Sequence, residues 1–116
     1  LGLISNAANP PDLNRLIDNH DLRKYFEVII ISAEEGIRKP NPQIIQRALD
    51  RFGVEADQAV LVGDTLNADI LGAQNAGIQG IWITRRANRA ENHKVQHQIV
   101  PDAEIPDLIS LLTLLS

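Results

Sequence analysis

The 116-residue chain contains no cysteine and no methionine, and only 3% of its residues are aromatic. The lack of cysteine excludes disulfide bonds, a thiol nucleophile and a cysteine-ligated metal site. The lack of methionine means that Leu1 is not a translational start, and the apolar opening LGLIS is typical of the middle of a core strand. We therefore expect residues 1–116 to be the C-terminal portion of a longer protein and to form a single domain.

Long hydrophobic runs and an excess of positive charge are absent as well. No apolar run reaches the ~18 residues that a membrane-spanning helix needs, and we recognise no signal peptide. The 11 basic and 15 acidic residues give a net charge of −4, which does not favour a nucleic acid or an anionic membrane as partner. We expect a cytoplasmic protein, of ordinary globular composition with 44% hydrophobic residues.

The sequence does contain a regular alternation of strands and helices. Short apolar runs predict strands at residues 1–5, 28–31, 59–62 and 80–84. Capping and proline signals predict helices opened by Asn9 and Pro10, by Asn41 and Pro42 up to Gly53, at about residues 67–76, and from Pro106 onward. The last of these helices carries Leu108, Ile109, Leu111, Leu112 and Leu115. Strands separated by helices pair in parallel, so we predict a Rossmann-like, three-layer α/β fold.

Two aspartates in the stretch VLVGDTLNADILGAQNAG lie where a strand gives way to a helix. Asp64 follows Gly63 at the strand end, and Asp69 lies in the first turn of the next helix. Two close carboxylates repel each other unless one is protonated or a cation lies between them. Oxygen ligands without histidine or cysteine suit a hard cation such as Mg²⁺. The alternative is that Asp69 only stabilises the helix N-terminus and that Asp64 is an ordinary loop residue.

Polar residues also follow the first two predicted strands. Ser5 and Asn6 offer a hydroxyl and backbone N–H groups that can bind a phosphoryl oxygen, although the same residues also cap helices. Lys39, in the stretch RKPNPQII, supplies a point charge for phosphate, and its alternative is a solvated surface lysine. Ligands of parallel α/β sheets bind beyond the carboxyl ends of the strands, so these groups together predict a phosphate site there.

A basic stretch and a single tryptophan complete the notable features. The basic residues are expected in a solvated loop after the fourth strand, or else in contact with a substrate or partner. They are Arg85, Arg86, Arg89, His93, Lys94 and His97. Trp82 lies within an apolar strand and is expected in the core. The histidines are too scattered to predict a metal site.

Taken together, LGLISN, RKPNP and VLVGDTLNADILGAQNAG resemble the second, third and fourth motifs of the haloacid dehalogenase-like (HAD) hydrolase superfamily. The resemblance covers essentially the whole chain and is greatest to the subfamily with a small helical cap between the first and second motifs. It implies that Ser5 and Asn6 bind the transferred phosphoryl group and that Lys39 stabilises the nucleophile and the phosphoryl charge. It further implies that Asp64 ligates Mg²⁺ and that Asp69 supports the metal directly or through water.

The first motif of that superfamily, a DxDxT that supplies the aspartate nucleophile and the general acid/base, does not occur in this chain. In the family its strand lies at the centre of the sheet, between the strand ending at Ser5 and the strand ending near Asp64. The resemblance thus implies a HAD-like core that lacks its first central strand and its cap, both belonging to a missing N-terminal segment of the same protein.

The activity that the resemblance implies for the whole protein is that of a Mg²⁺-dependent phosphatase. Its substrate would be a small phosphorylated metabolite, hydrolysed through a phospho-aspartate intermediate. GDTLNAD is the phosphatase form of the fourth motif, so the metal-independent dehalogenases resemble the chain less. Two alternatives stay open, a sugar-phosphate mutase and a non-catalytic HAD-like domain. Residues 1–116 alone are expected to be inactive.

Overall fold

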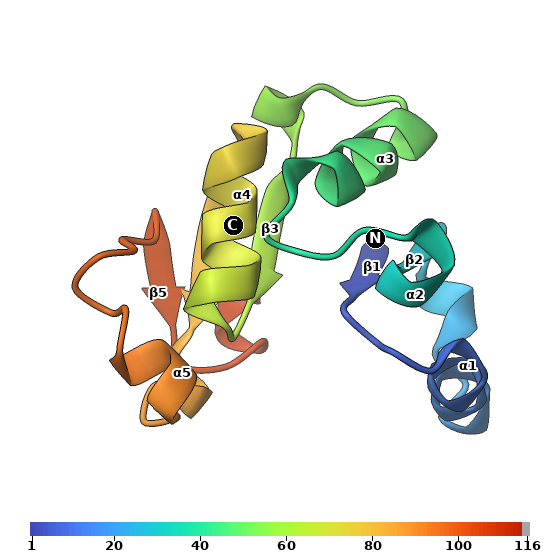
Figure 1. The fold of residues 1–116 in the computed structure, drawn as a ribbon, viewed down its shortest axis with the longest axis horizontal. Coiled ribbons are helices and arrows are strands. Elements are labelled where there is room, and N and C mark those ends of the chain that lie inside the picture. Colours follow the sequence, from blue (N-terminus) through green and yellow to red (C-terminus); the bar gives the residue numbers. More distant parts are fainter. Residues whose placement is uncertain (115–116) are drawn as a thin grey trace.

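The computed structural model describes residues 1–114, apart from the side chain of Leu112. It contains two parallel β-sheets with helices packed against them (Figure 1). The predicted α/β class with parallel strands is therefore confirmed. Within residues 1–114, no helix is long and apolar enough to cross a membrane.

The first sheet consists of β1 (Gly2–Ser5) and β2 (Val28–Ile31), which pair in parallel with Ser5 opposite Ile31. The connection between them contains α1 (Pro10–Asn19), whose cap Asn9 accepts the Asp12 N–H at 3.2 Å. Both strands and the helix agree with the sequence prediction. Their order brings the ends of β1 and β2 to one edge of the sheet.

The second sheet has the order β3-β4-β5, again with parallel pairing. Its strands are β3 (Val60–Gly63), β4 (Gln79–Ile83) and β5 (Ala103–Ile105). The strand β5 lies between the strand predicted at residues 80–84 and the helix predicted from Pro106, where no strand was predicted. Its three residues have a single buried side chain, Ile105, so backbone pairing with β4 rather than a hydrophobic pattern defines this strand.

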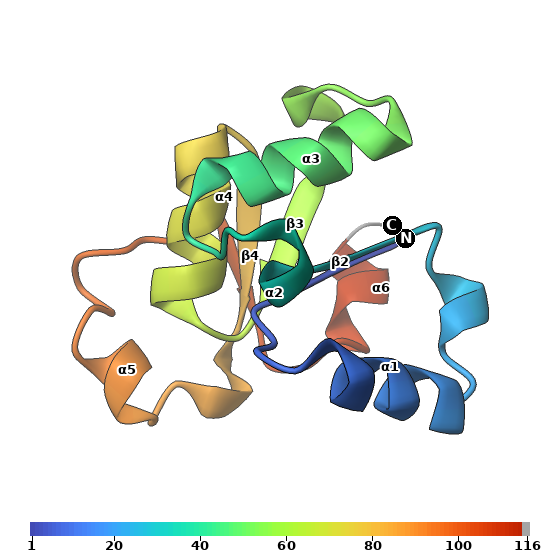
Figure 2. The ribbon, with the colours of Figure 1, turned by 45° about the vertical axis from the view of Figure 1, so that its right-hand side comes forward.

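The main core forms where α3 (Pro42–Phe52) covers β2. The predicted limits of this helix are confirmed: Asn41 caps its start by accepting the Gln43 N–H at 2.9 Å, and Gly53 ends it with a φ of 70°. One face of the helix packs against β2 and against α4 (Leu71–Ala76), which lies beside it in Figure 2. The buried residues of that face are Ile44, Ile45, Ala48 and Leu49.

The helix predicted for residues 67–76 is divided in two. A π-helical turn, Leu66–Ile70, comes first and leads directly into α4, which ends at Gly77 with a φ of 74°. The turn contributes Leu66 and Ile70 to a second core cluster, where they meet Trp82 of β4 and Ile99. The expected core position of Trp82 is confirmed, since only 6% of it is exposed.

The C-terminal helix begins later than predicted. Helix α6 spans Ser110–Leu114, and the prediction that Pro106 opens it was wrong. The Asp107 carboxylate accepts both the N–H and the hydroxyl of Ser110 at 2.9 Å, so the helix is capped from a turn. Leu108 and Ile109 precede the helix and are exposed. Leu115 lies outside the described residues.

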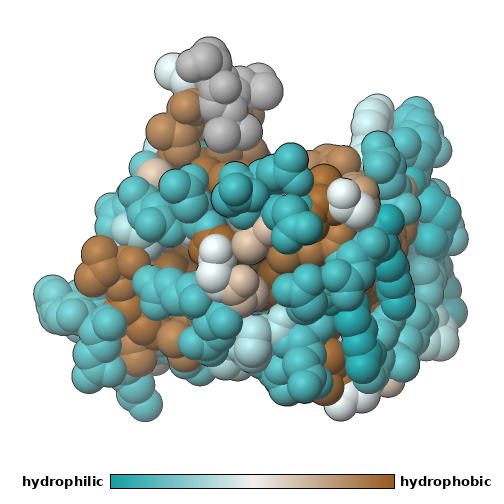
Figure 3. All heavy atoms as spheres, turned by 90° about the horizontal axis from the view of Figure 1, so that it is seen from above, coloured by the Kyte–Doolittle hydropathy of each residue, from teal (hydrophilic) through white to brown (hydrophobic). Residues whose placement is uncertain are grey.

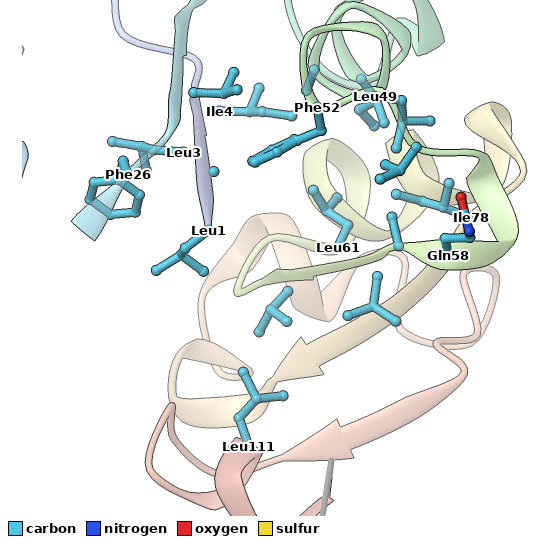
Figure 4. A pocket seen from close by; sticks show the side chains of 18 of the residues that line it. Leu1, Leu3, Ile4, Phe26, Leu49, Phe52, Gln58, Leu61, Ile78 and Leu111 are labelled. Carbon is cyan, nitrogen blue, oxygen red and sulfur yellow. The ribbon is translucent and has the colours of Figure 1, made fainter. Parts of the chain in front are cut away.

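An apolar groove separates the two sheets. Among residues 1–114, β1 is paired to β2 and β3 to β4, and β1 and β3 do not pair with each other. The groove between them has a volume of about 590 Å³ and is lined from both strands, from α3 and from the C-terminal segment (Figure 4). On the face of the molecule shown in Figure 3, hydrophobic residues are exposed between hydrophilic ones. The exposed apolar side chains along the groove include Leu1, Val60 and Leu108.

Candidate active site

The side chain of Lys39 joins the two sheets at their carboxyl edge. Lys39 lies between α2 (Ser32–Glu35) and α3, and its Nζ donates to the Ile4 carbonyl of β1 at 3.0 Å. The same ammonium donates to Asp69 Oδ1 at 2.5 Å, in the π-helical turn after β3. Only about a tenth of either side chain is exposed. The alternative of a solvated surface lysine is therefore excluded.

The side chain of Asn6 clamps the backbone of Lys39. Its Nδ2 donates to the Lys39 carbonyl at 3.0 Å, and its Oδ1 accepts the Lys39 N–H at 2.9 Å. Ser5, the last residue of β1, is half-buried and directly precedes this clamp. The structure thus brings Ser5, Asn6 and Lys39 together at the end of β1.

Asp69 is packed tightly under the end of β3. Its second oxygen, Oδ2, accepts the Thr65 N–H at 3.1 Å, so both carboxylate oxygens have a partner. The carboxylate also lies against the backbone of Gly63, where an added Cβ would overlap it. Gly63 is therefore needed for the close approach of Asp69 to the strand.

Asp64 differs from Asp69 in being open to solvent. A third of its side chain (34%) is exposed, and its partners are the Thr65 hydroxyl at 3.1 Å and the Arg86 guanidinium at 3.3 Å. Asp64 and Asp69 thus each have a basic partner of their own, Arg86 and Lys39. In this structure these two partners offset the repulsion that the sequence predicts between neighbouring carboxylates.

Arg86 is a site residue that sequence reasoning missed. It was treated as one member of a basic loop, yet it is the residue of that loop that pairs with Asp64. The signal was available, because β3 and β4 are neighbouring parallel strands and the segments after them must meet at one edge. Trp82 was missed in the same way: its indole N–H donates to the Asp64 carbonyl at 3.1 Å.

The residues present fit a hard cation at Asp64. Among residues 1–114 there is no group of three or more His, Cys, Asp or Glu side chains that could hold a metal. Mg²⁺ does not need such a group, because it takes one or two carboxylates and completes its shell with water and phosphate oxygens. Asp64 offers a partly exposed carboxylate of this kind, and Asp69 lies behind it, bonded to Lys39 and Thr65.

Comparison with known proteins identifies the family. Residues 1–83 match the model of the haloacid dehalogenase-like hydrolase family, so the chain belongs to that family. The predicted resemblance is thereby confirmed.

Curated relatives of the chain include phosphatases. It is 34% identical over 115 residues to glyceraldehyde 3-phosphate phosphatase of Methanothermobacter thermautotrophicus, covering 99% of this chain and 50% of the relative. It is 36% identical over 109 residues to phosphoserine phosphatase of Thermus thermophilus, covering 93% and 41%. The chain thus spans about half the length of these relatives.

Solved structures of similar fold include a dehalogenase and a magnesium-bound hydrolase. A 2-haloacid dehalogenase from Pseudomonas syringae superposes with a TM-score of 0.80 at 34% identity, covering 99% of this chain and 45% of that one. The HAD-family hydrolase YfnB of Bacillus subtilis, in a structure bound to magnesium, gives 0.82 at 25% identity, covering 99% and 47%. The HAD-like core fold is therefore shared over nearly the whole chain.

Proposed function

We propose that residues 1–116 form the phosphoryl- and cation-binding half of a Mg²⁺-dependent phosphatase that acts on a small phosphorylated metabolite. The observation that carries this proposal is the buried ammonium of Lys39, held between the end of β1 and Asp69, with the open carboxylate of Asp64 at the same edge. A fixed positive charge beside a cation ligand is what a transferring phosphoryl group requires.

The residues of this chain have distinct tasks in the proposed reaction. Ser5, with the backbone N–H groups at the end of β1, binds the phosphoryl oxygens, and Asn6 keeps Lys39 in register with it. Lys39 stabilises the negative charge that develops during transfer, because it is excluded from water and needs no reorganisation. Asp64, with the support of Asp69, would hold Mg²⁺, which would supply positive charge to neutralise and orient the phosphoryl group.

The aspartate nucleophile that forms the phospho-aspartate intermediate comes, in this proposal, from outside residues 1–116. We propose that it follows a β-strand of the same polypeptide that fills the groove between β1 and β3. Both strands are four residues long, and each is paired with a neighbouring strand only on the edge that faces away from the groove. A parallel strand inserted here would pair with both edges and would end beside Lys39, between Ser5 and Asp64.

The lining of the groove supports a strand as its occupant. Apolar side chains of Ile4 on β1 and Leu61 on β3 line the groove, together with Phe52 of α3 (Figure 4). A strand buried on both faces is apolar almost throughout, so its side chains would match this lining. The relatives are about twice as long as the chain, which leaves room for such a strand in a whole protein of the same length.

We favour a phosphatase over two alternatives, a dehalogenase and a sugar-phosphate mutase. The chain is similar to a 2-haloacid dehalogenase in fold, but GDTLNAD provides two carboxylates for a cation that a halide-releasing reaction does not need. The curated relatives described above are phosphatases by name, and YfnB was observed with magnesium. These similarities support a cation-dependent phosphatase.

The test uses the complete protein, an aryl phosphate as substrate and added Mg²⁺. We expect Mg²⁺-dependent phosphate release, its loss in Asp64→Asn with an unchanged melting temperature, and full activity in the control Asp57→Asn, which alters an exposed aspartate. Undiminished turnover in Asp64→Asn would contradict the assignment of Asp64. Halide release from 2-chloropropionate without any phosphate release would replace the proposal by a dehalogenase.

A further inference from the structure

Asn92 is a buried polar residue to which the sequence assigns no role. It lies in the short helix α5 (Ala90–His93), and 1% of it is exposed, less than any other buried polar residue of the described chain. A polar group at this depth is costly unless its hydrogen bonds are made. Asn92 makes them all to backbone groups.

The amide of Asn92 ties together the two segments that carry Asp64 and Arg86. Its Oδ1 accepts the Leu66 N–H at 2.8 Å, while its Nδ2 donates to the Asp64 carbonyl and to the Arg86 carbonyl, each at 2.9 Å. The backbone is therefore held on both sides of Thr65. The Asp64 carbonyl accepts a second bond from the indole of Trp82, so this turn is fixed from two directions.

The hydrogen bonds of Asn92 hold the backbone of Asp64 and leave its carboxylate free of Asn92. Asp64 is held at its carbonyl, and its carboxylate is left to Thr65, Arg86 and solvent. Leu66, held at its N–H, is fully buried and begins the π-helical turn that carries Asp69. One acceptor and two donors are needed in a fixed arrangement, which a carboxylate or a hydroxyl does not supply.

We infer that Asn92 is a positioning residue for the cation site: its hydrogen bonds to the backbone on both sides of Thr65 orient the Asp64 carboxylate toward the open edge. The inference rests on the proposed function, because it requires a divalent cation at Asp64. Residues that orient a metal ligand without touching the metal change its affinity by about 10- to 100-fold when they are replaced.

The experiment measures Mn²⁺ binding to the complete protein by electron paramagnetic resonance of the free ion, with Mn²⁺ as a probe in place of Mg²⁺. We expect the dissociation constant to rise at least about tenfold in Asn92→Ala. Asn92→Ser keeps one donor and one acceptor and is expected to fall between wild type and Asn92→Ala; it also serves if the alanine variant does not fold. The matched control is Ile99→Ala, which weakens the apolar cluster that contains Leu66 and Trp82 without removing the hydrogen bonds of Asn92.

The outcomes separate the two hypotheses. Wild-type affinity in both Asn92 variants, together with lost binding in Asp64→Asn, would overturn the role of Asn92 and leave the cation site intact. Equal weakening in Ile99→Ala and Asn92→Ala would also overturn it, because general loosening of the fold would explain both. Wild-type affinity in Asp64→Asn would remove the proposed cation site and this inference with it.

Discussion

Lys39 and Asp69 form the buried ion pair of the site, and their desolvation is its main electrostatic cost. Both are about nine-tenths buried, and a buried charge is tolerated only when its partner and further hydrogen bonds are in place. Here the Ile4 carbonyl and the Thr65 N–H complete the pair. Lys39 is therefore fixed in orientation before any substrate arrives, which is the condition for electrostatic stabilisation of a transition state.

We predict that Lys39→Ala in the complete protein lowers kcat by about 100-fold or more, because it deletes a preorganised charge. The same change leaves Asp69 buried without its partner and should lower the free energy of unfolding by about 3–5 kcal/mol. Steady-state kinetics and urea unfolding of the same samples measure the two effects. Lys24→Ala, which breaks an exposed ion pair with Asp21, is the control and should change neither. A rise in KM with unchanged kcat would indicate substrate attraction instead.

Arg86 competes with a cation for the carboxylate of Asp64. Its guanidinium lies 3.3 Å from Asp64 Oδ2, and half of its side chain is exposed. Exposed ion pairs contribute about 0.2–1 kcal/mol. We predict that Arg86→Ala tightens Mn²⁺ binding by up to about fivefold at low ionic strength, and less at high salt, because the pair is screened. Arg89→Ala, in the same basic loop, is the control. Weaker binding in Arg86→Ala would mean that Arg86 supports the site by holding Asp64.

Two ion pairs of Glu35, here called the Glu35 fork, link the helices on either side of Lys39. Glu35, at the end of α2, accepts hydrogen bonds from Arg47 at 2.5 Å and from Arg51 at 2.8 Å, both on α3. The fork thus spans the segment between the two helices, and Lys39 lies in that segment. The hydrogen bond from Arg47, followed by that from Arg51, lowers the pKa of Glu35 below its ordinary value of 4.5.

Because of this pKa shift, the contribution of the Glu35 fork to the free energy of unfolding depends on pH. Because the pKa is lower in the folded state, the contribution of Glu35 is complete above about pH 4.5 and is lost as the pH falls through the folded-state pKa. We predict that Glu35→Gln lowers the unfolding free energy at pH 7 and that its difference from wild type shrinks on acidification below pH 4.5. Urea unfolding at both pH values measures this, with Glu34→Gln as an exposed control. A difference that does not vary with pH would contradict the prediction.

The molecule as a whole is organised around its groove. Two parallel sheets present their edges β1 and β3 to each other, and both edges carry apolar side chains. Open strand edges promote pairing with other chains. We predict that residues 1–116, expressed alone, do not hydrolyse an aryl phosphate with Mg²⁺ and either associate or melt without cooperativity.

Size-exclusion chromatography, thermal melting and the phosphatase assay measure these properties. Addition of the remaining segment of the complete protein in trans should restore a monomeric, cooperatively melting complex. A monomeric, cooperative and active chain of residues 1–116 would contradict both the open groove and the external nucleophile. A stable, inactive dimer would instead indicate that a second copy fills the groove.

The elements with strong local signals were predictable. Asn41 before Pro42 and Gly53 at the other end define α3, because capping and the left-handed turn are decided by neighbouring residues. The β-branched run at residues 28–31 likewise defines β2. The start of α6 and the existence of β5 were predicted wrongly, since one depends on the Asp107 cap and the other on pairing with β4.

The sequence by itself determined the family, the parallel α/β class and which residues follow the strands, because motif spacing and hydrophobic periodicity are properties of the local chain. Only the tertiary structure decided which side chains form ion pairs and hydrogen bonds with each other. Lys39 pairs with Asp69, Arg86 with Asp64, and Asn92 with the backbone around Thr65. These partners are 22 to 30 residues apart in the sequence, so no local rule relates them. Their meeting follows from the parallel order of the strands, which brings the carboxyl ends of separate segments to one edge.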